Sequence, residues 1–150
     1  MPDSKVYWIH IGTNDFCLTE CSEEAVLLGI LRLAEEIHET SPGSVIVINS
    51  ILPRAPGSTQ PDFYGPIQEV NQQLEAFCVN HEHLVYFDAT PLFVNNPVLK
   101  KKNKSGDNTL RAGMFQADGF HLTLQGYKTW GNAILDRLKL IIYEDDESSY

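Results

Sequence analysis

The chain has 150 residues, of which 43% are hydrophobic and 21% are charged, as in a single globular domain with a sizeable core. Its net charge is −9 at pH 7 and no basic stripe is present to contact phosphates, so we expect no nucleic acid partner. No apolar run reaches membrane-spanning length, and three cysteines without a metal or pairing pattern favour a reducing compartment such as the cytoplasm.

The first half of the chain alternates between strand and helix patterns. The apolar run 6–11 predicts a buried strand that ends at Gly12. Ser22 is a suitable N-cap for a helix that ends at Pro42-Gly43. The inward face of that helix is predicted to carry Val26, Ile30, Leu33 and Ile37. A second apolar strand over 45–52 runs into a loop rich in proline and glycine.

The second half continues the alternation. Pro66 can occupy the first position of a helix whose inward face would carry Ile67, Val70, Leu74 and Phe77. A short strand follows over 84–87, and residues 91–116 are expected to be irregular. The last helix begins near Thr123, with its inward face predicted to carry Tyr127, Trp130, Ile134, Leu138 and Ile141. Residues 1–143 are assigned to one domain portion, and the acidic segment 144–150 to a solvated tail.

This alternation predicts an α/β protein with a three-layer αβα arrangement around a parallel sheet. In such sheets ligands bind at the carboxyl ends of the strands. Residues 12–15, 50–54 and Asp88 follow the three predicted strands, and residues 118–121 precede the last helix. We therefore expect these four segments to share one rim of the sheet.

Asp118 and His121 are the main candidates for catalysis. A carboxylate three residues before a histidine can fix the tautomer of the imidazole, which then acts as a general base. The alternative is a turn-forming aspartate followed by an unremarkable loop histidine. Asn14, between Gly12 and Asp15, can either supply an amide to an oxyanion or cap the turn. No metal site is expected, because His81-Glu82-His83 has no identifiable third ligand, and no cofactor is indicated.

Two of these segments carry a resemblance to a known family. Gly12-Thr13-Asn14-Asp15 resembles the third conserved block of the SGNH (GDSL-type) esterases, and Asp118–Thr123 resembles the fifth. Supporting matches are Gly126-Tyr127, Ile51-Leu52-Pro53-Arg54 and Glu69-Val70-Asn71. The nearest branch is the catalytic subunits of intracellular platelet-activating-factor acetylhydrolase, whose segments resemble His10-Ile11-Gly12-Thr13-Asn14 and Asp88-Ala89-Thr90-Pro91. The resemblance implies a flavodoxin-like fold and hydrolysis of small acyl esters. It assigns His121 and Asp118 to a Ser-His-Asp triad, Asn14 to the oxyanion hole, and Gly12 and Asp15 to its supporting loop.

The chain departs from the family pattern at the nucleophile. The family has a Gly-Asp-Ser block after its first strand, whereas only eleven residues precede Gly12 here and no serine takes that place. Ser4 precedes the first predicted strand, and the nearest similar tripeptide, Gly106-Asp107-Asn108, has no hydroxyl group. We therefore expect a domain that lacks the first two strands of the fold and is inactive alone. The sequence leaves open whether Met1 is the true start of translation.

Three hypotheses follow from that departure. The chain is a truncated esterase, a non-catalytic interaction protein, or half of a two-chain enzyme completed in trans. Each leaves the edge of the strand at 6–11 open, which soluble proteins generally avoid. An open edge favours a complementing chain as a partner, and the resemblance to the acetylhydrolase branch implies a homodimer.

Overall fold

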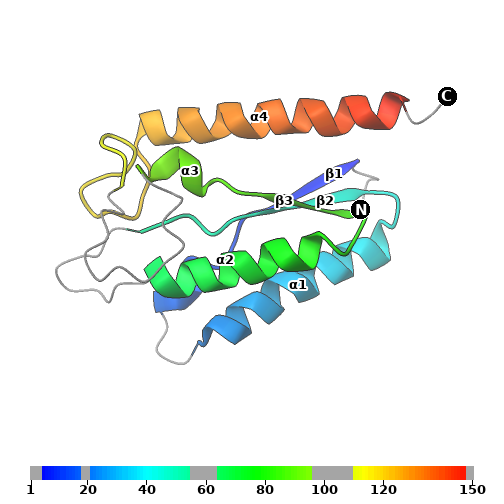
Figure 1. Ribbon diagram of the computed structural model, residues 1–150, viewed down its shortest axis with the longest axis horizontal. Helices are drawn as coiled ribbons and strands as arrows, with labels where there is room; N and C mark the ends of the chain where they lie inside the picture. The colour runs from blue at the N-terminus through cyan, green and yellow to red at the C-terminus, as the bar shows by residue number, and fades with distance from the viewer. Residues whose placement is uncertain (1–4, 18–20, 55–63, 96–109, 148–150) are drawn as a thin grey trace.

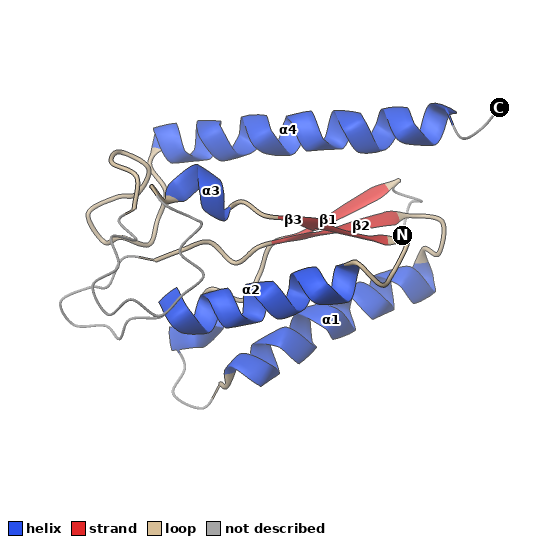
Figure 2. Cartoon of the chain, viewed as in Figure 1, coloured by secondary structure: helices blue, strands red, loops and turns tan. Residues whose placement is uncertain are grey.

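The computed structural model describes residues 5–17, 21–54, 64–95 and 110–147. Its centre is a parallel sheet of three strands in the order β1 (Val6–Ile9), β2 (Val45–Asn49) and β3 (Leu84–Phe87). Helices α1 (Glu23–Thr40) and α2 (Tyr64–Cys78) cover one face of the sheet, and α4 (Leu124–Glu147) lies over the other (Figures 1 and 2). The predicted three-layer α/β architecture is confirmed for this part of the chain.

Two short helices lie in the connections. The 3-10 helix η1 (Asp15–Cys17) follows β1, and α3 (Thr90–Phe93) follows β3. Both therefore lie beyond the carboxyl ends of strands, on the side where an active site is expected. None of the helices in the described ranges has the length and apolarity needed to cross a membrane.

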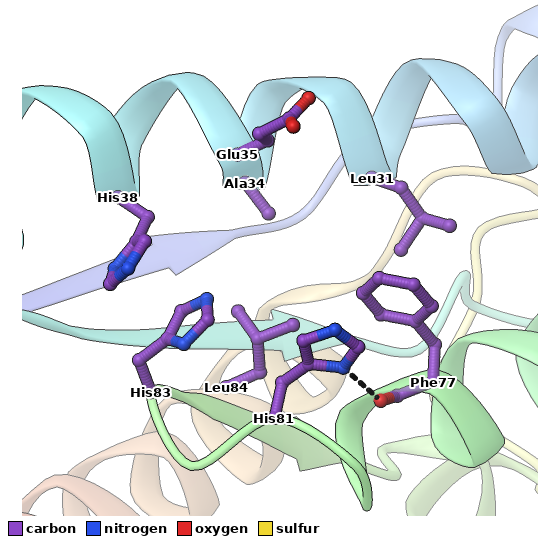
Figure 3. Close-up of a pocket in the computed structure, with 8 residues that line it drawn as sticks. All are labelled: Leu31, Ala34, Glu35, His38, Phe77, His81, His83 and Leu84. Carbon is purple, nitrogen blue, oxygen red and sulfur yellow. Dashed lines mark hydrogen bonds between the residues drawn. The ribbon is translucent and has the colours of Figure 1, made fainter.

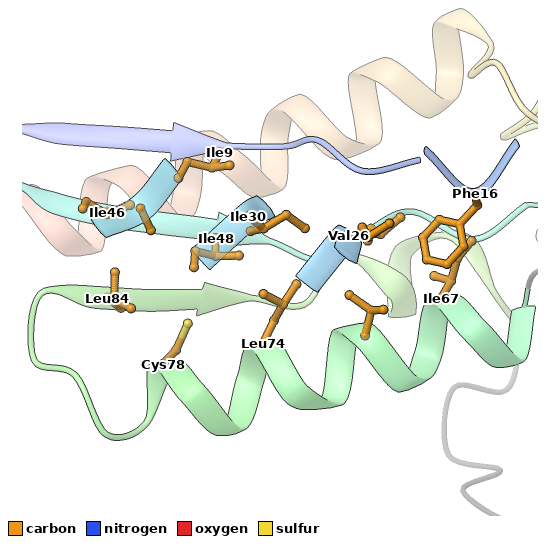
Figure 4. Close-up of a cluster of buried hydrophobic side chains, with 13 residues drawn as sticks. Ile9, Phe16, Val26, Ile30, Ile46, Ile48, Ile67, Leu74, Cys78 and Leu84 are labelled. Carbon is orange, nitrogen blue, oxygen red and sulfur yellow. The ribbon is translucent and has the colours of Figure 1, made fainter. Parts of the chain in front are cut away.

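The main core lies between the sheet and helices α1 and α2 (Figure 4). The strands contribute Ile9, Ile46 and Ile48, because alternate residues of a strand point to the same face. The helices contribute Val26, Ile30, Ala34, Ile67, Val70, Leu74 and Cys78. A second, smaller cluster of Leu52, Ala89, Phe93, Met114 and Leu122 packs α3 against the loop that precedes α4.

Helix α1 begins as its sequence predicts. The Ser22 hydroxyl accepts a hydrogen bond of 3.1 Å from the backbone N–H of Ala25, which satisfies one free donor of the first turn. Val26 and Ile30 are buried, while Leu33 and Ile37 are partly buried at the margin of the core. The predicted inward face of this helix is therefore correct.

Two other boundaries differ from expectation. The first strand ends at Ile9 rather than Ile11, and the second ends at Asn49 rather than Leu52. Residues Ser50 to Leu52 remain buried, but the backbone of Ile51 forms its hydrogen bonds with a side chain instead of with a neighbouring strand. The Asn71 amide accepts from the N–H of Ile51 at 2.8 Å and donates to its carbonyl at 2.9 Å. This bidentate contact replaces the sheet ladder at the end of β2.

Two aromatic residues predicted to face the core are exposed. Phe77 is 37% exposed, because Cys78, one helical step of about 100° away, takes the inward place. Tyr127 is 53% exposed, because Gly126 is the residue of that turn that packs inward, against Met114. Helix α2 also begins at Tyr64, two residues before Pro66.

A polar contact among the described residues ties helix α4 to the sheet. The indole N–H groups of Trp8 and Trp130 both donate to the Asn49 side-chain oxygen, at 3.2 and 3.1 Å. Several large apolar side chains of the helix remain exposed: Leu124, Leu135, Leu140, Ile142 and Tyr143. The backbone stays helical to Glu147, so the segment expected as a tail from residue 144 begins as helix.

Candidate active site

The turn after β1 requires glycine at residue 12. Gly12 has a positive φ of 104°, which residues with side chains rarely adopt. A Cβ atom there would also lie 3.0 Å from both Ile51 Cδ1 and Val26 Cγ1. The N–H of Asp15 donates to the Gly12 carbonyl at 3.2 Å and closes the turn into η1. Gly12 and Asp15 therefore shape the loop after β1.

Asn14 stands at the exposed tip of this turn, next to half-buried Thr13. Its side chain makes no hydrogen bond to any residue in the described ranges. An exposed amide at the carboxyl end of a strand can donate to a bound ligand without breaking a structural contact. A turn cap would instead bond to the local backbone.

Asp118 and His121 form a close polar pair at the rim. His121 Nδ1 lies 2.7 Å from Asp118 Oδ2, and Asp118 Oδ1 accepts from the backbone N–H groups of Phe120 and His121, each at 2.9 Å. Gly119 between them has a φ of 67°. The hydrogen bond from His121, followed by those from the two backbone amides, lowers the pKa of Asp118 to about 2. The carboxylate is therefore ionised at neutral pH and holds the imidazole by Nδ1.

The Asp–His loop is fixed at both ends. Its backbone closes through a hydrogen bond of 2.8 Å from the Gln116 N–H to the His121 carbonyl, and Phe115 pairs with Leu122. The Thr123 N–H then donates to the Met114 carbonyl at 2.9 Å. Both titratable side chains nevertheless face solvent, with 46% of Asp118 and 58% of His121 exposed. The pair is rigid at its base and accessible at its tip.

Arg54 lies between the turn and the Asp–His loop. Its Nη1 donates to the Thr13 carbonyl at 3.1 Å, and its guanidinium carbon lies 4.2 Å from the centre of the Phe120 ring. The side chain is only 7% exposed. Segments more than a hundred residues apart thus meet at one rim, as the sequence predicts. Phe120 was not predicted as a site residue, although its position directly before His121 in the sequence could have indicated a place in the site.

No serine in the described ranges is placed to act with His121. The Ser22 hydroxyl caps α1, the Ser41 hydroxyl bonds to the Tyr7 hydroxyl at 3.1 Å, and Ser44 is buried before β2. Ser50 follows β2 but is fully buried, with its hydroxyl accepting from the Ala89 N–H at 2.9 Å. The two positions weighed from sequence, Ser4 and Gly106–Asn108, lie outside the described residues.

His10 is a partly buried histidine that contacts helix α4. It lies just beyond β1, with its ring centre 4.6 Å from that of Trp130 in an edge-to-face contact. Burial lowers the pKa of His10, and its Nε2 is buried with no hydrogen-bond partner among the described residues.

A cluster of three histidines lies at the end of the sheet opposite to the Asp118–His121 pair (Figure 3). His38 of α1 stacks on His83, with ring centres 3.7 Å apart, and His81 Nδ1 donates to the Phe77 carbonyl at 2.8 Å. These residues line a cavity of about 320 Å³ together with Leu31, Ala34, Glu35 and Leu84. His38 thus joins His81 and His83, which sequence reasoning did not foresee. Even so, no three side chains in the described ranges are arranged to hold a metal ion.

A model of the GDSL-like lipase/acylhydrolase family matches residues 2–129. The chain belongs to this family. The fold and the Asp118–His121 pair at the rim of the sheet indicate the same class of protein. Among curated proteins, none is similar to this chain at a significant level.

Solved structures give the same fold. A GDSL-like lipase from Bacteroides thetaiotaomicron superposes with a TM-score of 0.72 at 20% identity, over 90% of this chain and 62% of the lipase. A family 3 carbohydrate esterase from Talaromyces cellulolyticus gives 0.69 at 14% identity, over 95% of this chain and 61% of the esterase. At these identities the likeness concerns the fold, and the chain spans less than two thirds of either protein.

Proposed function

We propose that this chain is the acid–base portion of a serine esterase that hydrolyses small acyl esters. The observation that carries the proposal is the 2.7 Å contact between His121 Nδ1 and an Asp118 carboxylate that is ionised at neutral pH. Membership of the acylhydrolase family and the exposed Asn14 on the same rim support it.

The geometry assigns a role to each residue. With Nδ1 engaged by Asp118, Nε2 of His121 is the nitrogen left to accept the proton of a serine hydroxyl as that oxygen attacks the ester carbonyl. The same nitrogen returns the proton to the departing alcohol, and a water molecule then releases the acid from the acyl-enzyme. Asn14 donates to the oxyanion that develops during both steps. The reaction requires neither a metal ion nor an organic cofactor.

The serine, in this proposal, comes from residues outside these 150. It belongs either to a preceding part of a longer polypeptide or to a second chain. The chain spans 62% of the lipase that it resembles, which leaves room for such a segment. In the described part of the sheet β1 is an edge strand, and α4 exposes Leu135 and Ile142. A strand added beside β1, followed by a helix, would cover both surfaces.

A fluorophosphonate probe tests this proposal, because it labels only serines activated by a neighbouring base. We expect no labelling of the 150-residue chain alone. We expect labelling of a serine outside it in the longer polypeptide or the assembled complex, together with hydrolysis of p-nitrophenyl acetate. His121→Ala and Asp118→Asn should each reduce kcat by about 10⁴-fold.

The matched control is His81→Ala, which removes a partly buried histidine at the opposite end of the sheet. It should leave kcat unchanged. Ester hydrolysis that survives His121→Ala would overturn the assignment of the base. Labelling of a serine within the 150 residues would overturn the outside origin of the nucleophile.

A non-catalytic interaction protein is the second candidate. The observation that favours it is the absence of a serine beside His121 in the described ranges, together with the open edge of β1. Here the edge would pair with a partner strand or with a second copy of the chain. A complex at this edge that shows neither probe labelling nor hydrolysis supports this candidate over the esterase.

A further inference from the structure

Arg54 is a cation that is almost completely buried at the rim. It follows the β2 strand and the Asn71-bonded turn, so its backbone is anchored to the core. Its side chain is 7% exposed, although arginine is rarely buried without a specific structural reason. The reason is found in the two segments that it contacts.

The guanidinium group contacts the donor turn by one edge. Nη1 donates at 3.1 Å to the carbonyl of Thr13, the residue directly before Asn14. A hydrogen bond to a charged donor restrains that peptide unit more strongly than a neutral contact does. The orientation of the Asn14 side chain depends on this same peptide unit, so the contact restrains the proposed oxyanion donor.

The guanidinium group also contacts the base loop, where its carbon lies over the Phe120 ring. Its carbon lies 4.2 Å from the centre of the Phe120 ring, within the range of a cation–π interaction. The Phe120 ring in turn meets the His121 ring edge to face, with centres 4.5 Å apart. Arg54, Phe120 and the imidazole therefore form a continuous series of contacts that leads from the core to the proposed base.

We infer that Arg54 is a positioning residue that sets the distance and orientation between the Asn14 turn and the His121 ring. This inference rests on the proposed function and extends it to a residue that does not itself touch the reacting atoms. A planar group with several N–H donors can bond in its plane and stack on its face at the same time. A lysine ammonium is a point charge on a flexible stem and cannot hold both segments in this way.

The first test uses the 150-residue chain and needs no activity. Amide resonances of Thr13, Asn14, Phe120 and His121 are followed by ¹H–¹⁵N NMR in Arg54→Met, Arg54→Lys and Phe120→Leu. We expect Arg54→Met to shift the resonances of both segments, and Phe120→Leu to shift chiefly those of the loop. Arg32→Met is the matched control, since Arg32 is exposed on α1 and pairs with Glu35 and Glu36. It should leave both segments unchanged.

The second test uses the complete esterase, with active sites counted by the fluorophosphonate probe. Displacement of a reacting group by about 1 Å costs on the order of 10²-fold in rate. We expect Arg54→Met to lower kcat per active site by about 10²-fold with little change in KM, and Arg54→Lys to recover only part of that loss. A purely structural role would instead reduce the number of active sites and leave kcat per site unchanged.

The two tests separate the possible failures. If the NMR shifts of Arg54→Met are confined to one segment, or equal those of Arg32→Met, the positioning role is wrong whatever the activity. If both segments shift but the complete protein shows no His121-dependent hydrolysis, the proposed function is wrong while the contact between the segments stands. An unchanged kcat per active site in Arg54→Met also overturns the inference.

Discussion

Replacing Gly126 by alanine is expected to destabilise the fold, because the residue has no room for a methyl group. Gly126 lies in the first turn of α4, and a Cβ atom there would collide with the Met114 carbonyl oxygen and lie 3.2 Å from Leu122 Cβ. That carbonyl is held by the Thr123 N–H at 2.9 Å, so it cannot move away without losing a hydrogen bond. Overpacking of this kind costs about 1–3 kcal/mol.

Gly131, five residues further along α4, provides a matched control. It has no atom within 4 Å of its would-be Cβ, so Gly131→Ala meets no obstacle. Alanine in an exposed helix interior is favoured over glycine by about 1 kcal/mol. The two variants carry the same chemical change in the same helix. Their free energies of unfolding should therefore lie on opposite sides of the parent value and differ by about 2–4 kcal/mol.

Urea unfolding followed by circular dichroism measures this difference, provided that the slope with urea is unchanged. A Gly126→Ala variant as stable as the parent would refute the reasoning, as would equal shifts in both variants. The Met114 segment also supports the Asp118–His121 loop through the Phe115–Leu122 bridge. Gly126→Ala should therefore perturb the NMR signals of His121, and Gly131→Ala should not.

Three further predictions concern side-chain contacts. Asn71→Leu should lower the free energy of unfolding by about 2–4 kcal/mol, measured by urea unfolding, because it removes two buried hydrogen bonds to Ile51. Burial, followed by the charges of neighbouring histidines, lowers the pKa of His83, so its neutral form stabilises the fold above about pH 6.5. That contribution is lost on acidification, and thermal unfolding between pH 7.5 and 5.5 should show a weaker pH dependence in His83→Gln. Since the pKa of Asp118 is lowered to about 2, its contribution to loop stability persists above about pH 4 and disappears towards pH 2. Amide exchange at His121 should show this loss in the parent and not in Asp118→Asn.

The layers of the fold were predictable from the sequence because they follow from hydrophobic periodicity. The strand at Leu84–Phe87 and the helix that starts after Ser22 have the predicted positions. The early end of β2 was not predictable, because it depends on Asn71, a residue twenty positions away whose amide replaces the strand ladder. The exposed positions of Phe77 and Tyr127 were missed for a related reason. A shift of one residue in helical phase depends on the surface to be filled, and apolar character alone does not specify it.

The candidate site was predictable to a different degree. The Asp118–His121 contact is local, because a turn with Gly119 at positive φ brings residues three apart together, so sequence spacing sufficed. The contact between Arg54 and Phe120 joins segments sixty-six residues apart. It depends on how β2 and the loop before α4 pack, which no local pattern contains. The His38–His83 stack was hidden in the same way, since α1 and the residue before β3 meet only in the folded chain.

The exposure of the Asp118–His121 pair bears on how the site would work. Both side chains are about half exposed, so water competes for the charges that a general base and its carboxylate develop during catalysis. Electrostatic stabilisation in enzymes is strongest where water is excluded. The proposed serine segment would therefore contribute more than a hydroxyl group, because it would also shield this pair. We expect His121 to react readily with diethyl pyrocarbonate in the 150-residue chain and slowly in the completed esterase. Equal reactivity in both forms would mean that the added segment supplies the nucleophile without covering the base.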